Sequence, residues 1–316
     1  MSFLTSNYVK LKKHFYRKES IDFTKLLGSY KNILIHPVME PGIEIFSIPT
    51  IVSIVKHLGS ENVELLINKK FKFFFNNIPA GKIIYEDFAS HLSSNYKKLK
   101  RNIEKKQYDL FIEMNRFDDE LLTLFGLLPR ASIRICLDSE KENPVYNMVI
   151  TSNGSSSEVD RNNLVLKPLG IKRKRKRIKW EKPQGMKVTK GKICIAMRNY
   201  RIGVKLFSVL KNLKFTPVFF LDDPQKVQAF HKNFGSNVMS IYPIENTYPV
   251  FVSCERVITS INHILSLSLL LKKRTLLFLE KDEQPGKEIN TSYVKVFLPG
   301  SRNFIFERAK TFVMER

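Results

Sequence analysis

The chain has 316 residues, 43% of them hydrophobic, which is enough apolar material for two ordinary domain cores. Its formal net charge of +23 favours polyanionic partners: phosphorylated glycolipid, an anionic membrane surface or nucleic acid. No apolar run reaches the roughly 18 residues of a membrane span, and Lys and Arg interrupt any signal-peptide pattern at the N-terminus. We therefore expect a cytoplasmic protein, whose attachment to the inner face of the cytoplasmic membrane, if it attaches, would be peripheral.

Residues 1–30 precede the first predicted strand and form a basic N-terminal extension. Lysines and arginines alternate there with apolar side chains, namely Phe3, Leu4, Tyr8, Leu11 and Phe15. The spacing resembles a basic amphipathic helix lying on a membrane. A helix packed on the first domain would show the same spacing, so both interpretations stay open.

The first strand is predicted at residues 31–38, and Pro41-Gly42 supplies the turn that follows it. The next stretch predicts a helix with one apolar face, formed by Ile45, Ile48, Ile51, Ile54 and Val55. A strand, a glycine turn and an amphipathic helix are typical of the opening of an α/β unit.

Strand and helix patterns then alternate through both halves of the chain. In the first half the further strands are predicted at residues 62–67, 82–85, 108–114 and 132–137. In the second half they are predicted at 192–197, 216–221, 237–242, 256–260 and 275–280. The alternation implies parallel sheets covered by helices on both faces, and therefore two Rossmann-like domains.

Composition divides the chain between these halves. We place the first domain at residues 31–170, a basic linker at 171–185, the second domain at 186–302 and a C-terminal helix at 303–316. The linker carries the predicted contacts to a membrane or another polyanion: Lys172, Arg173, Lys174, Arg175, Lys176, Arg177 and Lys179.

These basic residues also motivate a nucleic-acid-binding hypothesis, together with Trp180 and the basic stretch 97–106. Neither run interleaves aromatic residues regularly, and the chain shows no recognised nucleic-acid motif. Each Lys or Arg near an anionic leaflet contributes about 1 kcal/mol to binding. A membrane surface therefore explains the charges better than nucleic acid does.

Two segments of the first half resemble glycosyltransferase family 9, the ADP-heptose:lipopolysaccharide heptosyltransferases. In EPGIEIFSIPTI, Gly42 and Pro49 fit the family's G-D-x-x-x-x-x-P loop, whose Asp is taken to be the catalytic base. Ile43 stands at the position of that Asp. YDLFIEMNR, residues 108–116, resembles the family's Y-D-L-x-I-D-x-Q strand, with Glu113 for the Asp and Asn115 near the amide position.

Glu44 and Glu113 are the candidate bases that this resemblance leaves. A shift of one residue turns a helical side chain by about 100°, so Glu44 replaces the missing Asp only if the turn is rebuilt. The alternative is a first-turn carboxylate favoured by the helix dipole. For the second segment, the alternative is a buried strand that ends in polar loop residues.

A third segment, residues 256–279, resembles the family's strand, D-[ST]-G-x-x-H helix start and apolar helix. The motif positions are occupied by residues 261–266, so its Asp, Gly and His are replaced and His263 is shifted by three positions. The resemblance implies that Ser260, Asn262 and His263 lie near the donor's diphosphate at a helix N-terminus. A His at this position is also an ordinary polar residue at a helix start.

The loop AMRNYRIG offers Arg198 and Arg201, whose guanidinium groups suit a diphosphate, and Asp222 follows the next strand at a place suited to a ribose hydroxyl. Ordinary loop charges would give the same residues. The three cysteines are widely spaced in apolar runs and predict buried reduced thiols without a metal.

The resemblance implies a GT-B fold with two Rossmann-like domains, whose parallel sheets face each other across a cleft and whose last helix crosses back to the first domain. It implies transfer of a heptose-like sugar from a nucleotide-sugar, with an ADP-sugar favoured, to a lipopolysaccharide or other anionic glycolipid, without a cofactor. Loss of the base alone would cost 10²–10⁴-fold in rate, on the order of what general bases contribute. The alternative is a non-catalytic GT-B scaffold that binds an anionic glycan, a membrane or a protein.

Overall fold

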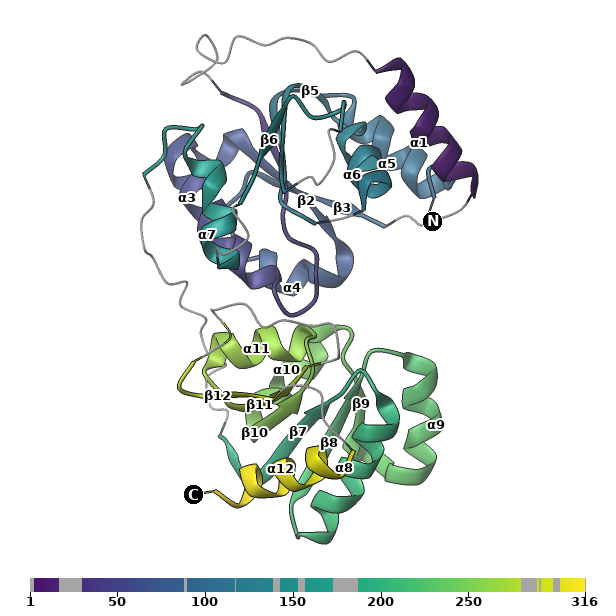
Figure 1. Cartoon of the computed structure of the whole chain (residues 1–316), viewed down its shortest axis with the longest axis vertical. Coiled ribbons are helices and arrows are strands. Elements are labelled where there is room, and N and C mark those ends of the chain that lie inside the picture. The colour runs from purple at the N-terminus through teal and green to yellow at the C-terminus, as the bar shows by residue number, and fades with distance from the viewer. Residues whose placement is uncertain are drawn as a thin grey trace. The chain divides into compact units, whose positions relative to one another are not determined.

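A computed structural model describes residues 3–16, 30–87, 90–116, 118–138, 143–152, 157–172, 187–279, 289, 291–297 and 302–315. The chain forms two compact units, Met1–Ile178 and Lys179–Arg316 (Figure 1).

The first unit is built on a parallel sheet with the strand order β3-β2-β1-β4-β5-β6. Its strands are β1 (Ile33–His36), β2 (Val63–Asn68), β3 (Lys82–Glu86), β4 (Gln107–Glu113), β5 (Arg130–Leu137) and β6 (Met148–Ile150). All five strands that the sequence predicted in this half are present, and β6 is additional. The order reverses between β1 and β4, which is where doubly wound folds place their ligands.

Helices cover both faces of this sheet, as the alternating pattern predicted. They are α1 (Phe3–Phe15), α3 (Ile48–Leu58), α4 (Lys72–Phe75), α5 (Ser94–Ile103), α6 (Asp119–Gly126) and α7 (Glu158–Asn163), with short 3₁₀ turns that include η1 (Glu44–Ser47). Figure 1 shows α3 and α7 on one face, and α5, α6 and α1 on the other. Every predicted apolar position of the first helix is buried, from Ile45 in η1 to Val55 in α3.

The second unit repeats this topology with the order β12-β11-β10-β7-β8-β9. Its strands are β7 (Thr189–Ala196), β8 (Thr216–Leu221), β9 (Val238–Ser240), β10 (Cys254–Thr259), β11 (Arg274–Phe278) and β12 (Val294–Phe297). Its helices are α8 (Tyr200–Asn212), α9 (Pro224–Phe234), α10 (Ile244–Ser253), α11 (His263–Leu271) and α12 (Arg302–Met314). The prediction of two Rossmann-like domains is confirmed, and β12 is the strand missed here.

The C-terminal helix α12 is an integral part of the second core. Its buried side chains Ile305, Ala309 and Phe312 join the cluster formed by α8 and the sheet. Arg256 of β10 also donates hydrogen bonds to the carbonyl oxygens of Phe312 and Glu315. These contacts lie within the second unit, and the return of residues 303–316 to the first domain stays a prediction.

Candidate functional site

The loop after β1 is the first candidate element, because it starts at the switch point of the first sheet. Gly42 has φ +97°, a conformation that favours glycine, and the backbone N–H groups of Ile43 and Glu44 donate to the carbonyl of Glu40 at 3.2 and 3.1 Å. The Glu44 side chain is fully buried, and its Oε2 accepts a hydrogen bond from the Gly42 N–H at 2.6 Å. This arrangement favours a structural role in which the carboxylate holds the turn.

Glu113 and Asn115 lie at the end of β4, directly beside β1. Glu113 is fully buried, and its Oε2 lies 2.7 Å from Nδ1 of His36, its neighbour across the two strands. Its other carboxylate oxygen accepts from the backbone N–H and the side-chain amide of Asn115, at 3.0 and 2.7 Å. Asn115 in turn donates to the carbonyl of Pro37 at 2.6 Å and accepts from the N–H of Met39. The structure therefore brings both predicted residues together, and they fasten the β1 loop to β4.

A pocket of about 360 Å³ lies where these loops meet, within the first unit. It is lined by Val38, Met39, Glu40, Pro41, Ile43, Asn115, Arg116, Glu158 and Arg161. Glu44 and Glu113 are absent from this lining, whereas Ile43, at the position of the family's Asp, is part of it. Glu40 and Glu158 are the acidic side chains that line this pocket.

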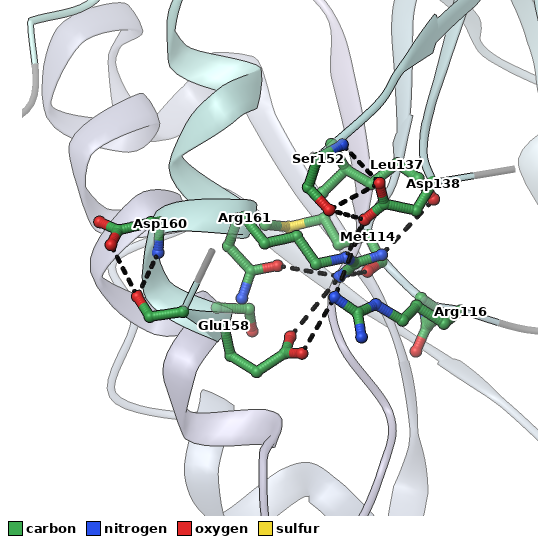
Figure 2. A network of polar contacts seen from close by, with 12 residues as sticks. Met114, Arg116, Leu137, Asp138, Ser152, Glu158, Asp160 and Arg161 are labelled. Atoms are coloured by element: carbon green, nitrogen blue, oxygen red, sulfur yellow. Dashed lines mark hydrogen bonds and ion pairs between the residues drawn. The ribbon is translucent and has the colours of Figure 1, made fainter. Parts of the chain in front are cut away.

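Three residues of this lining, Arg116, Glu158 and Arg161, belong to a network of ion pairs that also includes Asp138 (Figure 2). Arg161 of α7 is 1% exposed and donates through Nε to Asp138 at 2.7 Å and through a terminal nitrogen to the carbonyl of Met114 at 2.8 Å. Arg116, which is 47% exposed, lies 3.2 Å from the Glu158 carboxylate and 3.8 Å from that of Asp138. The network joins the ends of β4 and β5 to α7.

Burial shifts the pKa values of Asp138 and Arg161 toward their neutral forms, and hydrogen bonds and opposite charges shift them back. Burial raises the pKa of Asp138, but hydrogen bonds from Ser152 and Arg161 outweigh it, and the pKa lies below its ordinary value. Burial, with the nearby charge of Arg116, lowers the pKa of Arg161, while Asp138 and Glu158 partly oppose this. The charged forms of Asp138 and Arg161 therefore stabilise each other.

Sequence reasoning did not identify this network. The sequence of residues 152–163, SNGSSSEVDRNN, is polar and rich in turn-forming residues, yet it includes α7, whose Arg161 and Asn162 are buried. The available signal was positional, because Arg116 and Asp138 directly follow the ends of β4 and β5. Polar residues at the carboxyl ends of adjacent parallel strands meet at one edge of the sheet.

The second candidate element is the corresponding edge of the second unit, where β7 and β10 are neighbours. The backbone N–H of Arg198 donates to the buried Ser260 hydroxyl at 2.8 Å. Asn262 donates to the carbonyl of Ala196 at 2.8 Å, and its side-chain oxygen caps α11 by accepting from the N–H of Ile264 at 2.9 Å. The structure thus brings Arg198, Ser260 and Asn262 together, with the Asn262 side chain engaged as a cap.

The other residues predicted in the second unit differ in exposure. His263 is 2% exposed and packs edge to face on Tyr242, with ring centroids 5.2 Å apart. Arg201 is exposed in the first turn of α8, and Asp222 is exposed directly after β8. Asp223 caps α9, which leaves Asp222 as the exposed carboxylate of this pair. The exposed side chains suit a ligand at this edge, and the burial of His263 suits a packing role.

Within the predicted polyanion contacts, Lys172 is described and exposed, whereas 173–177 and Lys179 lie outside the described residues. Among the side chains that the structure describes, no group of three or more His, Cys, Asp or Glu is placed to hold a metal ion. None of the described helices combines the length and apolar character needed to cross a bilayer.

No protein-family model and no curated protein sequence matches this chain, but solved structures do. The E. coli heptosyltransferase WaaC, solved with ADP-2-deoxy-2-fluoro heptose, is 12% identical with a TM-score of 0.64 over 89% of this chain and 98% of its own. A glycosyltransferase of family 9 from Veillonella parvula is 14% identical with a TM-score of 0.64, over 95% and 100%. The E. coli ADP-heptose lps heptosyltransferase II is 9% identical with a TM-score of 0.63, over 90% and 98%. At these identities the likeness concerns the fold, and this chain has the two-domain GT-B fold of the family 9 heptosyltransferases, as its sequence resemblance predicted.

Proposed function

We propose that this protein is a glycosyltransferase of low turnover that takes a sugar from a nucleotide-sugar, with an ADP-sugar favoured, and transfers it to an anionic glycolipid. The observation that carries the proposal is the edge of the second sheet. There Arg198 and Arg201 accompany the start of α8, and α11 starts beside them at the end of β10. Arginines at helix N-termini next to a topological switch point form an environment suited to a diphosphate.

Two of the structural neighbours support the choice of donor. The WaaC structures were solved with ADP and with an ADP-heptose analogue. In this chain Asp222 is exposed directly after the next strand, a position that supports a contact with a ribose hydroxyl of the kind that acidic residues make in nucleotide-binding folds. The net charge of +23 supports an anionic acceptor and a peripheral position at the cytoplasmic face of a membrane.

In the first unit, the pocket beside β1 and β4 is the proposed acceptor site. Its mixed arginines and carboxylates suit the hydroxyl groups of a sugar, which donate and accept hydrogen bonds. Ile43 supplies no base there, and we propose low turnover because losing a general base costs on the order of 10²–10⁴-fold.

A second candidate function, binding without transfer, is favoured by the placement of the two predicted bases. Glu44 and Glu113 are fully buried, and their carboxylates accept hydrogen bonds from the protein itself. Such a protein would keep the nucleotide-sugar site or the acceptor site as a scaffold for a glycan, a membrane or a protein partner.

Calorimetric titration with ADP, UDP and GDP at low and at moderate ionic strength tests the proposal. A highly basic protein binds anions non-specifically, and salt screens that binding. We expect saturable binding that prefers ADP and persists at the higher salt, at least tenfold weaker in Arg198→Ala and Arg201→Ala. Lys211→Ala, at the far end of α8, is the matched control and should bind as the wild type does.

Incubation with an ADP-sugar and a lipid-linked acceptor then separates the two candidates. Release of ADP that depends on the acceptor supports transfer. Selective ADP binding without any release supports a scaffold that keeps the nucleotide-sugar site. Absence of selective ADP binding contradicts the transferase and favours a scaffold without a nucleotide site.

A further inference from the structure

We propose that α1 is a docking surface for anionic lipid membranes, with Leu4, Leu11 and Phe15 entering the headgroup layer. These side chains and Phe3 point away from the core, with 59%, 58%, 72% and 78% of their surfaces exposed, respectively. Large apolar side chains gathered on one exposed helix mark an interaction site.

The spacing of these residues makes a continuous stripe. At about 100° per residue, Leu4, Leu11 and Phe15 fall within a sector of roughly 40° around the helix axis. The buried residues Thr5 and Val9 lie on a different side, about 100° or more away. The helix therefore has two apolar faces, of which one packs on the protein and the other faces outward.

The packed face fixes how α1 is held. Val9 belongs to the core cluster of α5 and α6, and Thr5 Oγ1 lies 3.0 Å from both Ser90 Oγ and His91 Nδ1. Tyr8 stacks on His91 with ring centroids 4.3 Å apart, and the Ser6 hydroxyl donates to Glu120 of α6. Figure 1 shows α1 on the outer side of α5 and α6. These contacts hold the stripe in one orientation, so the surface is formed before any partner binds.

Charge indicates the partner. The helix carries Lys10, Lys12 and Lys13 and no acidic residue. The neighbouring α5 has the sequence SNYKKLKRNI, with four cations and no acid, and only Lys100 of these cations has an ion pair among the contacts described, a 3.6 Å contact with Glu104. Around the helix axis Lys12 lies about 80° from Leu4, Lys10 about 120° and Lys13 about 180°. An apolar stripe on a cationic helix, with no acidic residue in α1 or α5, complements the apolar interior and anionic headgroups of a lipid surface.

Nucleic acid and a second copy of this chain are the competing partners. Nucleic acid offers phosphates but does not account for a stripe of Leu and Phe. A second copy would bring another cationic helix to the same place, which like-charge repulsion opposes. The inference does not depend on the proposed function, because it involves neither the nucleotide site nor the acceptor pocket.

Vesicle flotation with the full chain tests this inference. The probes are vesicles of phosphatidylcholine alone and vesicles with about 30% phosphatidylglycerol, at about 150 mM NaCl. We expect flotation with the anionic vesicles, and at least tenfold weaker binding for the triple variant Leu4→Ser, Leu11→Ser, Phe15→Ser. The matched control removes three exposed apolar side chains of the second unit, Val188→Ser, Leu213→Ser and Met314→Ser, and should bind as the wild type does.

A second variant, Lys10→Gln, Lys12→Gln, Lys13→Gln, tests the charges without touching the stripe. It should bind anionic vesicles more weakly and with a smaller dependence on salt. Equal flotation of the wild type and the stripe variant would overturn the inference, as would absence of wild-type binding. Binding of duplex DNA or RNA without vesicle binding would assign the charges to nucleic acid, and a dimer that the stripe variant dissociates, without vesicle binding, would assign the stripe to self-association.

Discussion

Replacing Arg161 with methionine should strongly destabilise the first unit. The guanidinium is 1% exposed and holds Asp138 at 2.7 Å, and it also donates to the Met114 carbonyl, so it connects the ends of β4 and β5 to α7. The methionine side chain restores part of the volume but removes the charge and every donor. Asp138 and Glu158 then keep only the more exposed Arg116 as a cationic partner in this network.

The size of the expected loss of stability follows from the burial of the Arg161 side chain. Removing one partner of a buried ion pair costs about 3–5 kcal/mol, because the remaining charge is left uncompensated. Arg116→Met is the matched control, since Arg116 contacts the same two carboxylates but is 47% exposed. An exposed ion pair contributes only about 0–1 kcal/mol. We therefore expect Arg161→Met to be at least about 2 kcal/mol more costly than Arg116→Met.

Urea unfolding monitored by far-ultraviolet circular dichroism measures the difference. The chain has two compact units, so the curves are fitted with two transitions, and the mutated transition is assigned by comparing the variants. For a unit of this size, a loss of about 3–5 kcal/mol in the free energy of unfolding corresponds to a melting temperature lower by about 6–20 °C. Equal losses for the two arginine variants would show that burial does not set the strength of this network, and would refute the reasoning.

Three further predictions concern single residues. The pKa of Asp138 is lowered on folding, so the stability it confers is complete above the ordinary pKa of about 4 and is lost as the pH falls through the lower folded value; Asp138→Asn should flatten the acid limb of stability against pH. A Cβ at Gly203 would lie 2.4 Å from the buried Phe219 ring. Gly203→Ala should therefore overpack the core, at a cost of about 1–3 kcal/mol in stability, and lower the melting temperature. Ser208→Ala on the same helix is the control and should leave the melting temperature unchanged. All three cysteines, Cys136, Cys194 and Cys254, are buried, and burial raises the pKa of Cys254 to about 11. A thiol reagent at neutral pH should therefore label none of them before unfolding and all three after it.

The central strands were predictable because burial on both faces makes them continuous apolar runs. In the first sheet, β1 and β4 are examples, and all ten predicted strands are present in the two units. The two missed strands, β6 and β12, are three and four residues long and lie at sheet edges. Their side chains are largely half-buried or exposed, so no apolar run distinguishes them from loops.

The candidate site was predictable where its residues follow a strand directly. Glu113 and Asn115 were identified from the resemblance of residues 108–116 to the family's strand, and Arg198 from the loop after a predicted strand; all three lie at or just after the ends of β4 and β7. Arg161 was missed because its partner Asp138 is 23 residues away and its own helix has only six residues. A short polar helix has no apolar periodicity, so its burial depends on tertiary ion pairs that the sequence does not display.

The roles of Glu44 and Glu113 can be distinguished by whether a substitution lowers the rate of transfer or the stability of the fold. A general base that is replaced by its amide loses rate but leaves the fold nearly intact. Glu113 instead accepts two hydrogen bonds from Asn115 and lies 2.7 Å from His36 in a fully buried setting, so Glu113→Gln should cost about 1.5–3 kcal/mol, as hydrogen bonds to charged groups do. Glu44→Gln should behave similarly, because the Gly42 N–H would lose its carboxylate acceptor. If either variant keeps the wild-type melting temperature but loses transfer activity, that carboxylate acts as the base; a lower melting temperature with unchanged nucleotide binding would show that it serves to hold the loop after β1.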